Sequence, residues 1–236
     1  MEIKDRYKNK YFSILGDSIS TLEGYSEPYE FAFYNLEKKF EADVFSGIDT
    51  WWGKVIDALG GKLLKNNSIS GCTVVWSRGY DLPNYGCSDE RAQALKSGDI
   101  SPDVIIVYMG TNDWGRGVTV TLEKQGDTEE KDLTVFLDAY GVMLEKLRGN
   151  YPSAEIWCVS LGVSRWTGNG SFKFPFYKNG KHILEYCNAI KSCVNQLGGR
   201  FLDIYRSEED YDTIDGYHPN ASGMQTIANA ILKQLK

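Results

Sequence analysis

The sequence lacks a basic surplus and any long apolar run. Its net charge is −6 over 236 residues, so phosphate neutralisation is not favoured and nucleic acid is not expected as the main partner. No stretch of about 18 apolar residues is present, and we therefore expect no membrane span. The oligomeric state is left open by these numbers.

Cysteine and histidine are also scarce. The five cysteines show no Cys-x-x-Cys spacing and there are two histidines, so we do not expect a zinc site. Reduced, mostly buried thiols are the simplest interpretation, although a Cys72–Cys87 disulfide is conceivable in an exported protein. The N-terminus MEIKDRYKNKYF has charges but no apolar signal-peptide segment, which favours a cytoplasmic location unless an export signal has been removed.

What the chain does contain is a regular alternation of short apolar runs and segments of helical period. The run DVIIVYMG (103–110) is nearly continuous and β-branched, which is typical of a parallel strand buried on both faces. The alternation predicts one α/β domain over residues 1–236, with a parallel sheet between helices. Predicted strands span 11–15, 62–66, 103–110, 155–162 and 200–205, and predicted helices span 49–61, 88–98, 133–147, 183–197 and 224–235.

Two segments interrupt this alternation, and both follow a predicted strand. Residues 19–49 form an aromatic-rich insertion, and residues 114–131 are polar and rich in glycine. Open α/β sheets bind ligands beyond the carboxyl ends of their strands, so both segments are candidates for contact with a ligand. The aromatic side chains of 19–49 fit a small satellite core and a substrate platform equally well; they are Tyr25, Tyr29, Phe31, Phe33, Tyr34, Phe40 and Phe45.

Polar residues follow the predicted strand ends, and another polar block precedes the last helix. Ser18 follows the first strand, and Asp215 and His218 lie in DGYHPNASG before the last helix. A serine hydroxyl needs an adjacent base to act as a nucleophile, and a histidine oriented by an aspartate supplies one. Taken alone, each residue also fits a turn, a cap or a surface hydrogen bond.

The other two blocks contain groups that could stabilise an oxyanion. Gly71 lies in NNSISGCT and Asn112 in GTND. The backbone N–H groups of Ser18 and Gly71 and the side-chain amide of Asn112 would supply three donors. A glycine at position 71 would also permit close approach of the backbone to a ligand.

The blocks GDSIS, NSISG, GTND and DGYHP, in this order over residues 16–219, resemble those of the SGNH or GDSL hydrolase superfamily. The resemblance implies a flavodoxin-like three-layer α/β/α sandwich that needs no metal or organic cofactor. It implies Ser18 as nucleophile, His218 as base and Asp215 as its partner, with Gly71 and Asn112 joining the Ser18 amide in the oxyanion hole. Isoleucine replaces the family's leucine after Ser18, which leaves the chemistry unchanged.

Other polar and aromatic residues are assigned only by their position in the chain. Asp17 and Asp113 are expected to stabilise loops by accepting backbone N–H groups. His182, at the start of a predicted helix, is expected to be structural. Cys72 lies next to Gly71, and the packing of a small side chain is enough to explain a cysteine at that position. Candidate substrate contacts are Trp114, Arg116, Arg78, Tyr80 and Tyr85.

These residues predict a serine esterase that works through an acyl-enzyme. The expected substrate is a short acyl ester, such as an acetyl ester, of a carbohydrate or another polar small molecule. A lysophospholipase or acyl-thioesterase is the first alternative and would need an apolar groove for a long chain. A catalytically inactive carbohydrate-binding protein is a less favoured alternative. Such a protein should lack at least one catalytic residue, and this chain has all of Ser18, Gly71, Asn112, Asp215 and His218.

Overall fold

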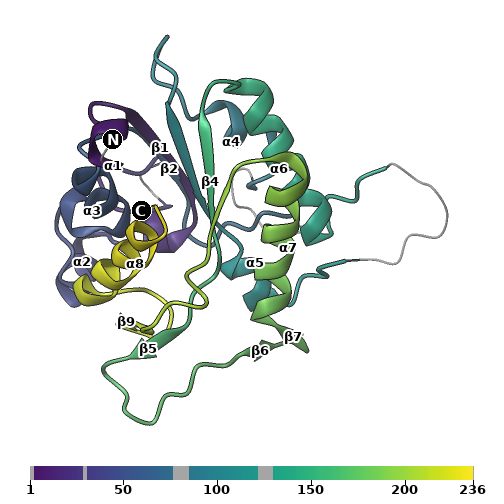
Figure 1. The fold of residues 1–236 in the computed structure, drawn as a ribbon. Helices are drawn as coiled ribbons and strands as arrows, with labels where there is room; N and C mark the ends of the chain where they lie inside the picture. Colours follow the sequence, from purple (N-terminus) through teal and green to yellow (C-terminus); the bar gives the residue numbers. More distant parts are fainter. Residues whose placement is uncertain (1–2, 29–30, 77–84, 122–129, 236) are drawn as a thin grey trace.

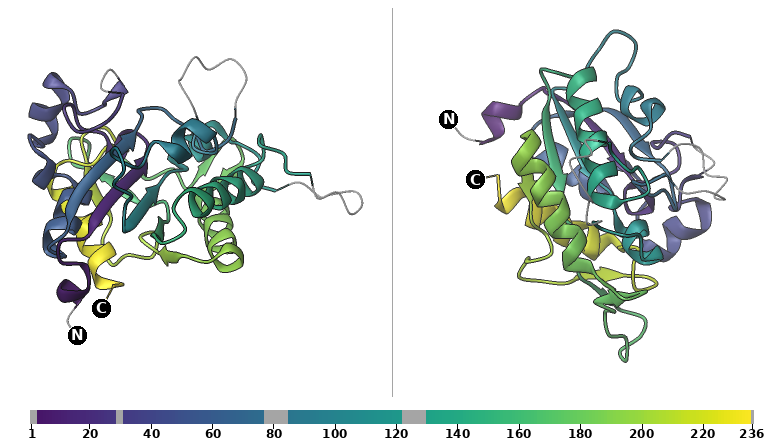
Figure 2. Two further views of the ribbon diagram at one scale, coloured as in Figure 1. Left: turned by 90° about the horizontal axis from the view of Figure 1, so that it is seen from above. Right: turned by 90° about the vertical axis from the view of Figure 1, so that its right-hand side faces the viewer.

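The structure is a computed structural model that describes residues 3–28, 31–76, 85–121 and 130–235. Its centre is a five-stranded, all-parallel sheet in the order β2-β1-β3-β4-β8. Helices cover both faces (Figures 1 and 2), giving the three-layer α/β/α sandwich that was predicted. The strands are β1 (Tyr11–Gly16), β2 (Lys62–Ser68), β3 (Val104–Tyr108), β4 (Glu155–Val159) and β8 (Arg200–Leu202).

The helices divide into two groups, each packed on one face of the sheet. On one side lie α1 (Ile3–Tyr7), α2 (Leu36–Ala42), α3 (Trp51–Ala58) and α8 (Ala221–Lys233). On the other lie α4 (Asp89–Gln93), α5 (Thr111–Arg116), α6 (Phe136–Asn150) and α7 (Ile183–Leu197).

The central strand β3 is buried along its whole length. Ile105 and Val107 belong to the core under α4, α6 and α7, whereas Val104, Ile106 and Tyr108 belong to the core under α3 and α8. Successive strand side chains point to opposite faces, so a strand between two helical layers needs apolar residues at every position. The prediction of a strand buried on both faces is confirmed.

Most predicted elements form, with shifted ends. The last helix begins at Ala221, because the Asn220 side chain caps it by accepting the Gly223 N–H at 2.9 Å. The predicted helix over 88–98 is shorter, ending at Gln93. The strands predicted to reach residues 162 and 205 end at Val159 and Leu202. Apolar residues continue beyond both ends, and the apolar pattern therefore does not mark where pairing stops.

Several short elements were not predicted. These are α1, α2, α5, the 3-10 turns η1 (Ser18–Ser20) and η3 (Gly47–Asp49), the parallel pair β5 (Ser164–Trp166) and β9 (Tyr211–Thr213), and the antiparallel hairpin β6 (Tyr177–Lys178) and β7 (Lys181–His182). Figure 1 shows β5, β9, β6 and β7 gathered below the main sheet. Strands of two or three residues carry too little pattern to be recognised locally.

The aromatic-rich segment 19–49 divides between core and surface. Tyr34 is fully buried in the core beside α3 and α8, and Phe31 packs on the opposite core. Phe40 and Phe45 are exposed and contact each other edge to face. Part of the segment thus joins the main cores, and the single domain over 1–236 with an insertion at 19–49 stays a prediction.

Two expectations from the composition can be compared with the fold. All five cysteines lie within the described ranges; each is buried, and none forms a disulfide. Across the described residues, no helix combines the length and apolar character needed to cross a membrane.

Candidate active site

The ends of β1, β2 and β3 bring three of the four sequence blocks together, and the fourth, DGYHP, lies between β9 and α8 and reaches Ser18 through His218. Gly16, the last residue of β1, lies opposite Ser68 of β2 and Tyr108 of β3. A Cβ on Gly16 would lie 2.6 Å from the Ser20 side chain and 2.7 Å from the Ser68 hydroxyl oxygen. Only glycine therefore lets the chain turn this closely against the neighbouring strand end.

Ser18 begins the η1 turn directly after β1. Asp17 caps this turn, with its Oδ1 accepting the Ile19 N–H at 3.0 Å. The serine is 7% exposed, and its hydroxyl lies at the edge of a cavity. The local sequence therefore presents one hydroxyl to the cavity at the end of a buried strand.

Ser18, His218 and Asp215 form a connected row of side chains. Ser18 Oγ lies 2.9 Å from His218 Nε2, and His218 Nδ1 lies 2.6 Å from Asp215 Oδ2. The second carboxylate oxygen, Oδ1, accepts the N–H groups of Tyr217 and His218 at 2.9 and 2.8 Å. A carboxylate at Nδ1 favours the tautomer with a proton there, which leaves Nε2 able to accept the serine proton.

The electrostatics of Asp215 agree with this arrangement. Burial raises the pKa of Asp215, but the hydrogen bond and positive charge of His218, together with two backbone N–H groups, outweigh burial and lower the pKa to about 2. The carboxyl is therefore ionised throughout the neutral range. An ionised Asp215 is able to stabilise a positive charge on His218.

The sequence predicts three oxyanion donors, and two of the residues that would carry them, Ser18 and Asn112, line one cavity. The backbone N–H groups of Ser18 and Gly71 donate no hydrogen bond to any described residue, and Gly71 has φ +75°, which favours glycine. Asn112 lines the same cavity as Ser18. Its side-chain amide donates to the Cys72 carbonyl at 3.0 Å, which orients the group and leaves its second N–H for a ligand.

The loop that carries Gly71 is fastened to α5. The buried carboxylate of Asp113 accepts the N–H groups of Val74 and Val75 at 2.9 to 3.2 Å. Arg116 donates from Nη2 to the Gly71 carbonyl at 2.8 Å. The expected loop-stabilising role of Asp113 is thus visible in the structure, and Arg116 has a role in positioning the Gly71 peptide.

A buried arginine that the sequence did not indicate ties the strand ends together. Arg91 of α4 is 2% exposed. It donates to the carbonyls of Gly16 and Asn67 at 3.0 and 2.7 Å, to the Asn67 side chain, and to the Cys72 sulfur at 2.9 Å. Gly16 and Cys72 flank the segments that carry Ser18 and Gly71, and Arg91 therefore ties these two segments together.

Burial also perturbs the carboxyl of Asp17. Desolvation raises its pKa to about 7, against the hydrogen bond from Ile19 and the attraction of Arg91. Its Oδ2 atom has no hydrogen-bond partner within the described part of the chain. A buried oxygen of this kind is tolerated more readily when the carboxyl is protonated.

The cavity at Ser18 has a volume of about 200 Å³. Two predicted substrate contacts, Trp114 and Arg116, line it. Tyr85 does not, because it packs edge to face on Trp76 beside a separate hollow, and Arg78 and Tyr80 lie outside the described residues. The cavity is lined by Ser18, Ile19, Thr111, Asn112, Trp114, Gly115, Arg116, Lys178, Tyr217 and His218.

The structure adds site residues that sequence reasoning missed. The Phe33 ring stacks on the His218 imidazole, with centroids 3.5 Å apart and planes 10° apart. The Tyr34 hydroxyl donates to the Pro219 carbonyl at 2.7 Å and so fixes the loop after the histidine. The aromatic richness of 19–49 was a general signal for both, but it did not distinguish them from Phe40, which is exposed.

His182, by contrast, has the structural role that was expected. Its Nδ1 accepts the Leu184 N–H at 3.0 Å, and its backbone N–H donates to Glu185 at 2.8 Å. These bonds form a capping box at the start of α7.

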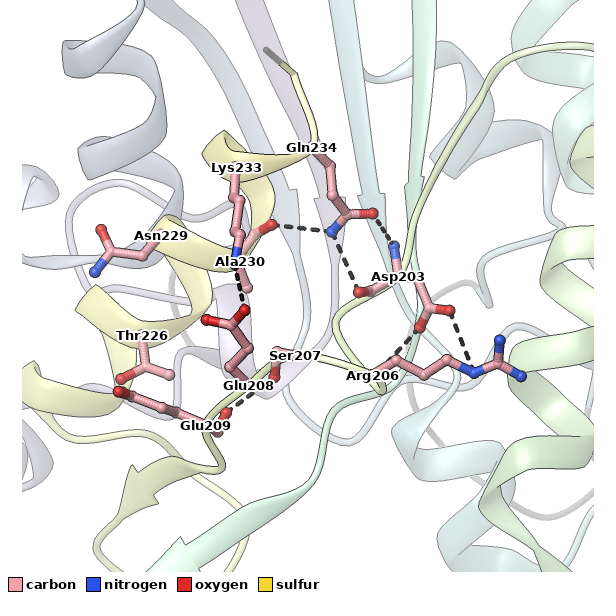
Figure 3. Close-up of a pocket in the computed structure, with 10 residues that line it drawn as sticks. All are labelled: Asp203, Arg206, Ser207, Glu208, Glu209, Thr226, Asn229, Ala230, Lys233 and Gln234. Atoms are coloured by element: carbon pink, nitrogen blue, oxygen red, sulfur yellow. Dashed lines mark hydrogen bonds and ion pairs between the residues drawn. The ribbon is translucent and has the colours of Figure 1, made fainter.

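A larger hollow of about 650 Å³ lies between α8 and the segment after β8 (Figure 3). Several of its polar groups are paired with one another: Lys233 with Glu208 at 2.6 Å, and the Gln234 side chain with the backbone of Asp203 at 2.8 and 3.2 Å. None of the residues that line it is Ser18, His218 or Asp215. The smaller cavity is therefore the candidate active site. Among the described residues, no group of three or more His, Cys, Asp or Glu side chains is placed to hold a metal ion.

Comparison with known proteins places the chain in a family. The model of the GDSL-like lipase/acylhydrolase family matches residues 10–162, and the chain belongs to this family. A crystal structure described as a GDSL-like lipase, from Bacteroides ovatus, is 28% identical and covers 97% of this chain and 98% of its own, with a TM-score of 0.70.

Two curated relatives are much longer than the region they share with this chain. A multidomain esterase from Ruminococcus flavefaciens is 29% identical over 67% of this chain and 20% of its own length. The cellulase/esterase CelE from Acetivibrio thermocellus is 24% identical over 66% of this chain and 16% of its own length.

Proposed function

We propose that the protein is a serine esterase, a carboxylic ester hydrolase that removes short acyl groups, such as acetyl, from a polar alcohol. One observation carries the proposal: Ser18, His218 and Asp215 form a connected row with contacts of 2.9 and 2.6 Å, and the Ser18 backbone N–H donates to no described residue. Family membership agrees with ester cleavage.

The geometry gives each group a step in acyl transfer. Ser18 Oγ attacks the ester carbonyl as His218 Nε2 takes its proton, and the oxyanion is stabilised by the N–H groups of Ser18 and Gly71 and by the Asn112 amide. Collapse expels the alcohol, which receives the proton from His218 and leaves an acyl group on Ser18. Water then attacks this acyl-enzyme by the same route, releasing the acid and restoring the serine.

A short acyl group is supported by the size of the cavity. Its volume of about 200 Å³ is below the roughly 300–1,000 Å³ of pockets for drug-sized ligands. A carbohydrate alcohol is supported by aromatic side chains at the site and by the names of the curated relatives, a multidomain esterase and a cellulase/esterase.

Hydrolysis of p-nitrophenyl esters from acetate to palmitate tests this proposal, with Ser18→Ala alongside. We expect activity on acetate and butyrate that falls by at least about 10³-fold in the variant. Ser20→Ala is the matched control, because Ser20 lies in the same turn and its hydroxyl has no partner among the described residues. Most activity remaining in Ser18→Ala would refute the mechanism, and a preference for long chains would favour a lysophospholipase or thioesterase instead.

A further inference from the structure

A short hairpin carries a lysine into the candidate active site. Strands β6 and β7 are joined by Asn179 and Gly180, whose φ values of 47° and 77° are those of a two-residue hairpin turn. The Asn179 side chain donates to the Gly115 carbonyl at 3.3 Å. Gly117 makes room for this contact, since a Cβ there would lie 2.4 Å from the Asn179 Cβ. The hairpin is thereby fastened to α5, the helix that carries Asn112.

Lys178 precedes this turn, and its side chain lies over aromatic rings at the site. Its Nζ atom is 4.0 Å from the centre of the Tyr217 ring and 5.2 Å from that of Trp114. It makes no ion pair with any described carboxylate. An ammonium held on ring faces is positioned without being neutralised.

The cavity itself carries a positive excess. Lys178 and Arg116 both line it, and none of the described residues that line it is Asp or Glu. Arg116 is engaged with the Gly71 carbonyl. The carboxylate of Asp215, beside the cavity, is paired with His218. Lys178 is therefore a cation of the cavity that no described carboxylate pairs with, which favours an anionic ligand over a cationic one.

We propose that Lys178 selects ester substrates whose leaving alcohol carries a carboxylate. The side chain rests on Tyr217, which lines the same cavity as Ser18 and His218. Because the proposed acyl group is short and uncharged, a carboxylate attracted by Lys178 would belong to the leaving alcohol. This inference rests on the proposed function, and it narrows the substrate class to acyl esters of hydroxy acids, which include acidic sugars.

The test compares two acetyl esters of nearly equal shape, 3-acetoxybenzoate and the neutral 3-acetoxybenzamide, for the wild type and Lys178→Met. Methionine keeps much of the apolar stem and removes the charge. We expect kcat/KM for the anionic ester to fall about fivefold, mainly through KM, while the neutral ester changes less than twofold. Lys178→Arg should keep the preference, and 1 M NaCl should weaken it in the wild type but not in Lys178→Met.

Lys181→Met is the matched control, because Lys181 pairs with Lys178 across the hairpin but does not line the cavity. An equal fall for both esters in Lys178→Met would assign the lysine a structural role and overturn the inference. An unchanged ratio of the two esters would overturn it as well. If the wild type hydrolyses neither ester nor p-nitrophenyl acetate, the proposed function fails and the inference fails with it.

Discussion

Replacing Asp215 by asparagine tests whether its carboxylate controls the tautomer of His218 in the Ser18–His218–Asp215 row. Asp215 uses both carboxylate oxygens: Oδ2 faces His218 Nδ1 at 2.6 Å, and Oδ1 accepts two backbone N–H groups at 2.8 and 2.9 Å. An asparagine whose oxygen keeps the backbone bonds must turn its NH₂ group toward Nδ1. Nδ1 then becomes an acceptor, the ring proton moves to Nε2, and His218 can no longer accept the proton of Ser18.

The size of the effect follows from two losses. The charge interaction between Asp215 and the imidazolium is about 4 kcal/mol at 4 Å and an effective dielectric constant of about 20. The pair is only 19% and 36% exposed, so solvent screens it incompletely. Reversing the tautomer, or turning the amide against the backbone donors, costs at least one hydrogen bond, about 1.5 kcal/mol. We therefore expect kcat to fall by about 10⁴.

The assay is steady-state hydrolysis of p-nitrophenyl acetate at pH 8, with thermal unfolding of each variant to confirm folding. Asp212→Asn is the matched control, because Asp212 pairs with Arg165 and Ser222 and does not contact His218. This control should keep wild-type kcat. If Asp215→Asn kept more than a tenth of the wild-type kcat, the carboxylate would not be what sets the tautomer and the charge of His218.

Three further predictions concern neighbouring groups. Asn112→Ala should lower kcat about 10²- to 10³-fold if its amide stabilises the oxyanion; a loss under threefold would exclude the amide from the hole. Phe33→Ala removes the ring stacked on His218 and should lower kcat about three- to tenfold, while Phe33→Tyr should keep most activity. Equal kcat values for Phe33→Ala and the wild type would show that the stacked ring does not orient the imidazole. The folded state holds the Asp17 proton up to about pH 7, whereas the ordinary pKa is 3.8, so the contribution of this group to stability decreases as pH rises between these values. The free energy of unfolding, measured in urea, should therefore be higher for Asp17→Asn than for the wild type at pH 8, by up to about 4 kcal/mol, with a smaller difference at pH 5. An equal or lower free energy of unfolding for the variant at pH 8 would contradict a buried, neutral Asp17.

Much of the fold could be predicted from the sequence, because its large elements carry their own periodic patterns. The nearly continuous apolar run 103–110 is typical of a strand between two helical layers, and the structure places β3 there. Three of the four polar blocks could be assigned to one edge because parallel strands end together, and the fourth was joined to them by the family resemblance. Ser18 and His218 are 200 residues apart in sequence and 2.9 Å apart in space.

Tertiary structure decided which other side chains complete the site. Nothing local distinguishes Phe33, which stacks on His218, from Phe40, which is exposed, since both are single aromatic residues in an irregular segment. Arg91 belongs to a polar helical stretch and is nevertheless buried, because the ends of two strands supply carbonyl acceptors for its guanidinium. The hairpin with the Asn-Gly turn at 179–180 was not predicted, and its contact with α5 arises only in the folded chain. Sequence pattern therefore determined the scaffold and the candidate catalytic residues. Long-range packing decided what surrounds them, since burial and pairing depend on segments that are distant in the sequence.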